Sequence, residues 1–230
     1  MNFFKKINAV AIDGPAGSGK STVSRLVAER LGYTYIDTGA TYRALTLKVM
    51  RKNVDLSDRK AIIELSGDLD LVLTPSEKEG RTINVILDGV DVSEEIRRME
   101  VTVNVKHVCK IPEVRKNMVD LQRKMASEAN GAVMEGRDTG TVVLPGAKYK
   151  FYVDAAFDER VERRFAEMRA KGVPVPKSEI EDDLKQRDHT DKTREVGPLK
   201  KADDAVLIDT TDLTIDQVVA KIVELVSRKG

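Results

Sequence analysis

Apolar positions near the start of the chain switch between two periods. A short apolar run at 10–12 is typical of the end of a buried strand, and apolar residues recur at helical spacing between Ser21 and Leu31. The stretch 33–37 predicts a second strand, and Thr38 leads into a second helix. This order of strand, helix, strand and helix favours a parallel sheet, in which ligands bind at the carboxyl ends of the strands.

The pattern changes between residues 56 and 99. Short alternating stretches lie at 69–73 and 82–92, and the second of them contains Asp88-Gly89, a typical hairpin turn. An antiparallel hairpin does not belong in a parallel core. We therefore expect an insertion that rises from the core and can cover a bound substrate.

From Pro112 onward the chain again alternates between helical and strand periods. Pro112 suits the first turn of a helix that runs to about Glu128. Together the segments predict an α/β fold with a five-stranded parallel sheet and flanking helices. The further strands are predicted at 132–135, 149–154 and 205–209, and the further helices at 158–170, 178–193 and 214–227.

Composition narrows the class of protein. The 230 residues, 41% of them hydrophobic, suffice for one α/β core with insertions or at most two compact units. No apolar run approaches the roughly 20 residues that span a bilayer, so we expect a cytoplasmic protein without a membrane partner. A net charge of +1 and an aromatic content of 4% disfavour binding to nucleic acid. No interface signal stands out, which leaves a monomer as the expectation.

The strongest chemical signal stands between the first strand and the first helix. Residues 13–22 read Asp-Gly-Pro-Ala-Gly-Ser-Gly-Lys-Ser-Thr, which matches the phosphate-binding pattern of Gly, any four residues, Gly, Lys and Ser or Thr. Backbone N–H groups of such a loop converge on an anion, while Lys20 follows a terminal phosphate and Ser21 is placed to ligate Mg²⁺. An ordinary Gly-rich turn is the alternative, which the strand-loop-helix context disfavours. We expect a nucleoside triphosphate, ATP before others, to bind at Gly14, Pro15, Ala16, Gly17, Ser18, Gly19, Lys20, Ser21 and Thr22.

The predicted helix at 158–170 carries a cluster of arginines. Arg160, Arg163 and Arg164 fall on one side of it, where a lid could close their guanidinium groups over a triphosphate. Neighbouring glutamates offer an alternative, a solvated face of ion pairs. A Pro-containing turn at 172–176 follows and is consistent with a hinge.

Further polar groups lie at the carboxyl ends of predicted strands and on three helices. A Gly-rich turn with an adjacent cation and carboxylate, as at 136–141, is where a parallel sheet places ligand contacts. Each group also has a plain alternative, namely a solvated helix charge, a hydrogen bond within a turn or an exposed salt bridge. The candidates are Thr38, Arg43, Arg115, Arg137, Asp138, Arg187, Asp191 and Arg194.

One nucleotide loop and several arginine groups from separate segments indicate more than one phosphate-bearing ligand. Phosphoryl transfer needs aligned reactants, neutralised charge and exclusion of water, with little covalent help from protein. The chain lacks the Asn-Lys-x-Asp motif of a small GTPase, and it lacks a paired Asp-Glu after a strand, which would polarise water in an ATPase. We therefore expect transfer to a phosphate acceptor other than water.

Four motifs together resemble the bacterial-type cytidylate kinase family. Besides the loop at 13–22, they are Asp-Thr-Gly-Ala-Thr-Tyr-Arg at 37–43, Glu-Gly-Arg-Asp-Thr-Gly-Thr-Val-Val at 135–143 and Arg-Asp-His-Thr-Asp-Lys-Thr-Arg at 187–194. The resemblance spans nearly the whole chain, whereas the phosphate loop alone is shared with many families. It implies a fold like that of P-loop nucleoside monophosphate kinases. The implied reaction moves the γ-phosphoryl group of ATP to CMP, and also to dCMP, with Mg²⁺.

The same resemblance implies roles for the candidate residues. Lys20 and its loop would hold the ATP phosphates, and the three lid arginines would meet the transferring phosphate. Lys106 stands where the family commonly has a serine that faces the base, which leaves that contact open. The resemblance implies Arg43, Arg137 and Arg194 for the CMP phosphate, Thr38, Arg115 and Asp138 for the base, and Arg187 and Asp191 for the sugar.

The resemblance also divides the chain into three parts. Residues 1–37, 109–156 and 195–230 form the expected P-loop core, 38–108 a nucleoside-monophosphate-binding region with the hairpin insertion, and 157–194 the lid and adjoining helix. Two rival functions remain. A different small-molecule kinase, acting on shikimate or another nucleoside monophosphate, would share the loop, and a non-catalytic regulator would bind ATP without turnover.

Overall fold

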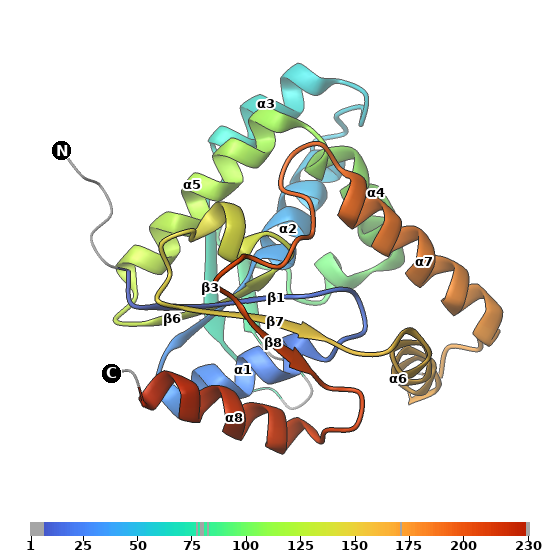
Figure 1. The fold of residues 1–230 in the computed structure, drawn as a ribbon. Helices are drawn as coiled ribbons and strands as arrows, with labels where there is room; N and C mark the ends of the chain where they lie inside the picture. Colours follow the sequence, from blue (N-terminus) through green and yellow to red (C-terminus); the bar gives the residue numbers. More distant parts are fainter. Residues whose placement is uncertain (1–6, 77, 79–80, 82, 171, 229–230) are drawn as a thin grey trace.

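A parallel sheet of five strands forms the centre of the protein, in the order β2-β6-β1-β7-β8 (Figure 1). The computed structural model describes residues 7–76, 78, 81, 83–170 and 172–228. Strand β1 is buried throughout and pairs with β6 on one side and β7 on the other, so its carboxyl end lies in the middle of the sheet edge. The strands are β1 (Ala9–Asp13), β2 (Thr34–Asp37), β6 (Ala132–Gly136), β7 (Tyr149–Asp154) and β8 (Val206–Asp209).

Helices cover both faces of this sheet, as the sequence predicts. Helices α1 and α8 lie side by side on one face, where Val27 and Ile222 are completely buried (Figure 1). Helix α5 covers the other face, and its Val119 packs with Ile36 and Met134 of the sheet. The bounds of these helices are α1 (Lys20–Leu31), α5 (Pro112–Glu128) and α8 (Ile215–Ser227).

The chain between β2 and α5 contains a separate antiparallel sheet in the order β3-β4-β5. Its inner residues Ile83, Val85 and Leu87 are buried in the same apolar cluster as Val27 of α1. The hairpin prediction is therefore confirmed, but the sheet packs into the core instead of rising from it, because its alternating pattern creates one apolar face that must be covered. This region consists of α2 (Thr38–Arg51), α3 (Arg59–Gly67), β3 (Leu71–Pro75), β4 (Ile83–Leu87), β5 (Val90–Asp91), the 3₁₀ helix η1 (Glu95–Arg97) and α4 (Met99–Cys109).

Two helices, α6 (Phe157–Ala170) and α7 (Lys177–Thr193), lie beyond the carboxyl end of β7 (Figure 1). They pack against each other through buried residues such as Val161 and Leu184. Among the described residues, no helix combines the length and apolar character needed to cross a membrane.

The burial of β4 generates a stability prediction. Leu87 is 1% exposed and Leu207, on the edge strand β8, is 54% exposed. Leu87→Ala should lower the free energy of unfolding by about 2–5 kcal/mol, because it leaves a cavity in the core, whereas Leu207→Ala should change it by roughly 0.5 kcal/mol or less. Urea denaturation of both variants measures the difference. Equal midpoints would contradict the packing of the inserted sheet on the core.

Candidate functional site

The phosphate loop lies between β1 and α1, and side chains of the protein donate hydrogen bonds to three of its backbone carbonyl groups. A bound carbonyl fixes its peptide plane and leaves the N–H groups of the loop free to face an anion at the start of α1. Three donors from different parts of the chain make these bonds. They are Lys20 Nζ to the Pro15 carbonyl (2.9 Å), Arg160 Nη1 to that of Ala16 (3.0 Å) and Thr210 Oγ1 to that of Ser18 (3.3 Å).

Lys20 is 6% exposed and is the first residue of α1, directly after the glycines of the loop. Burial, with Arg137 nearby, lowers the pKa of its ammonium group to about 7, while Glu135 opposes the shift. A lysine that titrates near neutrality gains a proton readily when an anion binds beside it. The side chain is therefore poised to respond to a phosphate ligand.

Glu135 lies one residue before the end of strand β6, beside the phosphate loop, and was not among the predicted site residues. Its Oε1 accepts hydrogen bonds from Ser21 Oγ (2.7 Å) and from the hydroxyl of Tyr35 (3.0 Å). Its Oε2 is buried without a hydrogen-bond partner among the described residues. Burial and the nearby Asp37 raise the pKa of Glu135. A carboxylate at the end of a buried strand, next to the strand of the phosphate loop, was the available signal.

The donor set at this point suits Mg²⁺. This ion prefers oxygen ligands, keeps several waters and uses one or two protein groups together with substrate phosphates. The hydroxyl of Ser21 and the carboxylate of Glu135 supply two such oxygens. The Oε2 atom of Glu135 has no hydrogen-bond partner among the described residues and is available as a ligand. The residues present therefore fit the metal that the sequence leads us to expect.

Asp13, the last residue of β1, connects the phosphate loop to the turn after β6. Its carboxylate accepts the backbone N–H groups of Thr139 (2.8 Å) and Gly140 (2.7 Å). Burial raises the pKa of Asp13 to about 6, although both hydrogen bonds act in the opposite direction. The sequence predicted only a Gly-rich turn at 136–141, whereas the chain forms the π-helix η2 (Thr139–Val143) here.

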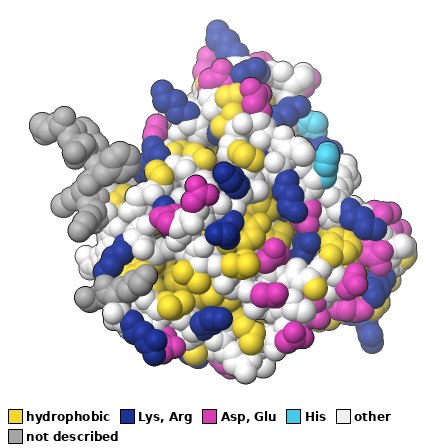
Figure 2. Space-filling model, in the orientation of Figure 1, with side chains coloured by type: hydrophobic (Ala, Val, Ile, Leu, Met, Phe, Trp, Pro, Cys, Tyr) yellow, Lys and Arg dark blue, Asp and Glu magenta, His cyan; other side chains and the backbone are white. Residues whose placement is uncertain are grey.

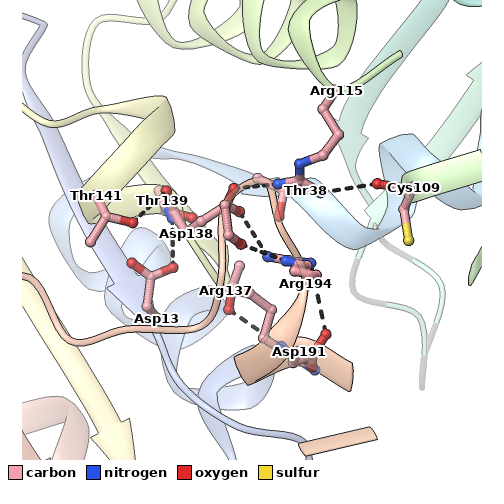
Figure 3. A network of polar contacts seen from close by, with 12 residues as sticks. Asp13, Thr38, Cys109, Arg115, Arg137, Asp138, Thr139, Thr141, Asp191 and Arg194 are labelled. Atoms are coloured by element: carbon pink, nitrogen blue, oxygen red, sulfur yellow. Dashed lines mark hydrogen bonds and ion pairs between the residues drawn. The ribbon is translucent and has the colours of Figure 1, made fainter. Parts of the chain in front are cut away.

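A second charged cluster is centred on Asp138, immediately before η2 (Figure 3). Arg115 of α5 and Arg194 from the end of α7 both form ion pairs with its carboxylate. Arg137 turns the other way, and its Nε donates to Asp191 Oδ2 at 2.7 Å. The structure thus brings together five of the predicted site residues, from three separate segments of the chain.

The remaining predicted substrate residues, Thr38, Arg43 and Arg187, have partners outside this cluster. The hydroxyl of Thr38 donates to the carbonyl of Glu135 at 2.8 Å, and Arg43 pairs with Asp37 at 2.9 Å, so both lie at the ends of β2 and β6. Arg187 instead has a 43% exposed side chain that lies 4.0 Å from Asp183. Burial and the nearby Arg137 lower the pKa of Arg187, while Asp183 and Asp191 oppose the shift. Arg187 therefore lies close enough to the cluster for its charge to act there, although its ion pair is with Asp183.

A cleft of about 800 Å³ opens beside Arg115 and Arg194. His107 and Cys109 of α4 also line it, and the carbonyl of Cys109 accepts a hydrogen bond from Arg115 at 3.4 Å. Burial raises the pKa of the Cys109 thiol, which keeps it protonated. The cleft gives a ligand room beside Arg115 and Arg194, which both pair with Asp138, and a protonated thiol is a poor nucleophile.

The three arginines of α6 have three different surroundings. Arg160 is buried and bonded to the loop carbonyl of Ala16. Arg163 donates to the carbonyl (2.6 Å) and hydroxyl (2.9 Å) of Thr210, and lies near Gly19. Arg164 is partly exposed and pairs with Glu167 at 2.7 Å, which agrees with the ion-pair alternative. The three guanidinium groups do not converge on one point.

A phosphate loop after the central strand of a parallel sheet, with a second charged cluster at the same edge, is typical of a P-loop kinase. The sequence model of the cytidylate kinase family matches residues 10–228. The chain therefore belongs to the cytidylate kinase family and is a phosphotransferase.

Individual relatives agree with this assignment. A cytidylate kinase of Caldicellulosiruptor bescii is 48% identical over 221 residues, which cover 96% of each chain. One of Desulforamulus reducens is 49% identical over 219 residues, or 95% of this chain and 96% of the other. A crystal structure of an uncharacterized protein from Eubacterium ventriosum, 15% identical, covers 95% of this chain and 98% of its own with a TM-score of 0.50, and supports the fold alone.

The lowered pKa of Lys20 predicts proton uptake on nucleotide binding. At pH 8.5 a lysine with a pKa of about 7 is mostly neutral, and a triphosphate beside it raises that pKa, so binding should take up as much as about one proton. At pH 6 the lysine is already charged and the uptake should be small. Calorimetric titration with ATP in two buffers of different ionisation enthalpy measures the proton count. Lys20→Met should abolish the uptake, and identical heats in both buffers at pH 8.5 would contradict it.

Proposed function

We propose that this protein transfers the γ-phosphoryl group of ATP to CMP, and to dCMP as well. The observation that carries the proposal is the hydrogen-bonded link through Asp13, which holds the phosphate loop and the Asp138 cluster at one edge of the sheet. In-line transfer requires donor and acceptor phosphates to be held together in this way. Membership of the cytidylate kinase family supports the choice of substrates.

On the donor side, we assign the loop residues 14–22 to the phosphates of ATP. Lys20 would accompany the terminal phosphate, and Arg163 and Arg164 would approach from α6. Ser21 and Glu135 would hold Mg²⁺. When bound, this ion neutralises charge on the phosphate oxygens. Arg163 must first leave Thr210, and Arg164 must leave Glu167, which costs little at a partly exposed position.

On the acceptor side, the arginines that line the cluster would bind the CMP phosphate. They already balance carboxylates in the free protein, so an arriving phosphate exchanges one anion for another instead of meeting bare charge. We assign Arg43, Arg137 and Arg194 to the phosphate, Thr38, Arg115 and Asp138 to the base, and Arg187 and Asp191 to the sugar.

Asp138 is suited to the selection of cytosine over uracil. An ionised carboxylate only accepts hydrogen bonds, and cytosine offers an exocyclic amino group where uracil offers a carbonyl. Arg115 and Arg194 form ion pairs with this carboxylate. With UMP, the carboxylate of Asp138 would face the carbonyl oxygen of uracil, and two hydrogen-bond acceptors would repel each other.

We further propose that the substrates are small molecules and that the division into core, acceptor region and lid holds. Core is 1–37, 109–156 and 195–230, acceptor region 38–108, and lid with adjoining helix 157–194. Basic and acidic side chains are interspersed on the face shown in Figure 2, which is not the pattern of a polyanion-binding surface.

Turnover with CMP is the first test. A coupled assay for ADP should show release that depends on CMP and on Mg²⁺, and far less with shikimate or AMP as acceptor. Lys20→Ala should reduce kcat by about a hundredfold or more, because a charge that acts on the transferring phosphate is lost. Lys221→Ala, an exposed lysine on α8, is the control and should behave like the parent. Absence of CMP-dependent ADP release would overturn the proposal.

Specificity should depend on Asp138. Asp138→Ala should lower kcat/KM for CMP and reduce the preference for CMP over UMP by about tenfold or more, because the acceptor that distinguishes the two bases is gone. The exposed Asp203→Ala serves as the matched control. Competition between CMP and UMP in one reaction measures the ratio directly, and an unchanged ratio would assign the discrimination to other residues.

A further inference from the structure

Helices α6 and α7 are packed onto the phosphate loop itself. Ala16, in the middle of the loop, is 5% exposed and lies in an apolar cluster with residues of both helices. The loop and the proposed lid therefore share a small core and do not move as unrelated parts. The other buried members of this cluster are Val161, Ile180 and Leu184.

Arg160 crosses this cluster and is 6% exposed. Its Nη1 donates to the carbonyl of Ala16 at 3.0 Å, and its Nη2 donates to Asp188 Oδ2 on α7 at 2.7 Å. The aromatic ring of Phe157 lies 5.3 Å from the guanidinium carbon. Both terminal nitrogens thus already donate to protein groups, on a side chain that is buried.

The backbone of α6 also touches the loop at this point. Gly17 has φ +77°, a conformation that favours glycine, and a Cβ there would lie 3.1 Å from the Cβ and the carbonyl oxygen of Arg160. Arg160 therefore lies behind the loop, against the carbonyl side of the peptide between Ala16 and Gly17.

The geometry of a trans peptide gives this contact a consequence. The C=O and N–H groups of one peptide point in opposite directions, so a carbonyl of Ala16 fixed toward Arg160 directs the N–H of Gly17 away from α6. Converging N–H groups of this kind are what a phosphate loop offers to an anion. The hydrogen bond to the Ala16 carbonyl thus fixes the direction of the Gly17 N–H, one of the donors that the loop offers to a phosphate.

We propose that Arg160 and Asp188 act as a positioning pair for the phosphate loop. Asp188 holds the guanidinium group, the guanidinium group holds the Ala16 carbonyl, and the N–H of Gly17 is thereby set for the nucleotide. This assignment replaces the predicted contact of Arg160 with the transferring phosphate. It rests on the proposed binding of ATP in the loop, and it extends the site to a residue of α7.

Binding of ADP and ATP separates this role from a contact with the γ-phosphate. In Arg160→Met and in Asp188→Asn, the affinity for both nucleotides should fall by the same factor, about tenfold, because a buried charge-assisted hydrogen bond behind the loop is lost. The double variant should bind no more weakly than Arg160→Met, since Asp188 acts through Arg160. Calorimetry without CMP measures these affinities, so a failure of the proposed phosphorylation of CMP does not affect the result. Arg169→Met and Asp182→Asn, exposed positions on the same two helices, are the controls.

Arg160→Lys gives the second discrimination. A lysine keeps the charge but cannot reach two acceptors as a fork does, so it should bind both nucleotides as weakly as Arg160→Met. If Arg160→Met does not fold, Arg160→Lys and Asp188→Asn carry the same comparison. A loss confined to ATP, recovery in Arg160→Lys, or unchanged binding in Asp188→Asn would each overturn the positioning pair.

Discussion

The two hydrogen bonds accepted by Asp13 hold the functional site together. They join the end of β1 to residues 126 and 127 positions later in the chain. Because β1 is the central strand, its carboxyl end is flanked by both neighbours, and the parallel register sets Asp13 opposite Gly136. The phosphate loop and the Arg137-Asp138 turn must therefore emerge side by side. Burial at this position disfavours the charged form of Asp13 and raises its pKa to about 6.

The role of each arginine on α6 depends on the groups around it more than on its position along the helix. The arginines of α6 follow one another at helical spacing, yet one is buried behind the loop, one is bonded to Thr210 and one is paired at the surface. A buried charge-assisted hydrogen bond contributes more than an exposed pair, which is worth about 0–1 kcal/mol. The buried member is thus the one whose loss should be felt at the loop.

The Asp138 cluster shows how a buried set of charges stays compatible with folding. Asp138 is bound by two arginines, and a Cβ at Gly197 (φ +61°) would overlap its carboxylate, so that residue must be glycine for the chain to pass. Arg137 and Asp191 form a further pair at the same edge. An uncompensated buried charge here would be costly, and the mutual pairing of the side chains reduces that cost.

The sequence by itself determined the β-α-β-α order, the five-stranded parallel sheet, the hairpin and the phosphate loop, because periodicity and glycine spacing are local properties of the chain. It also identified Arg137 and Asp138, which stand at the end of a strand, and the arginines on the helices around them as candidates. Only the tertiary structure decided that the inserted sheet packs into the core and that Arg187 pairs with Asp183 while its charge also acts on Asp191. It likewise decided that Asp13, Glu135 and Asp188 belong with the site. Their partners are distant in the chain, and burial together with the direction of a side chain arises only when the elements pack.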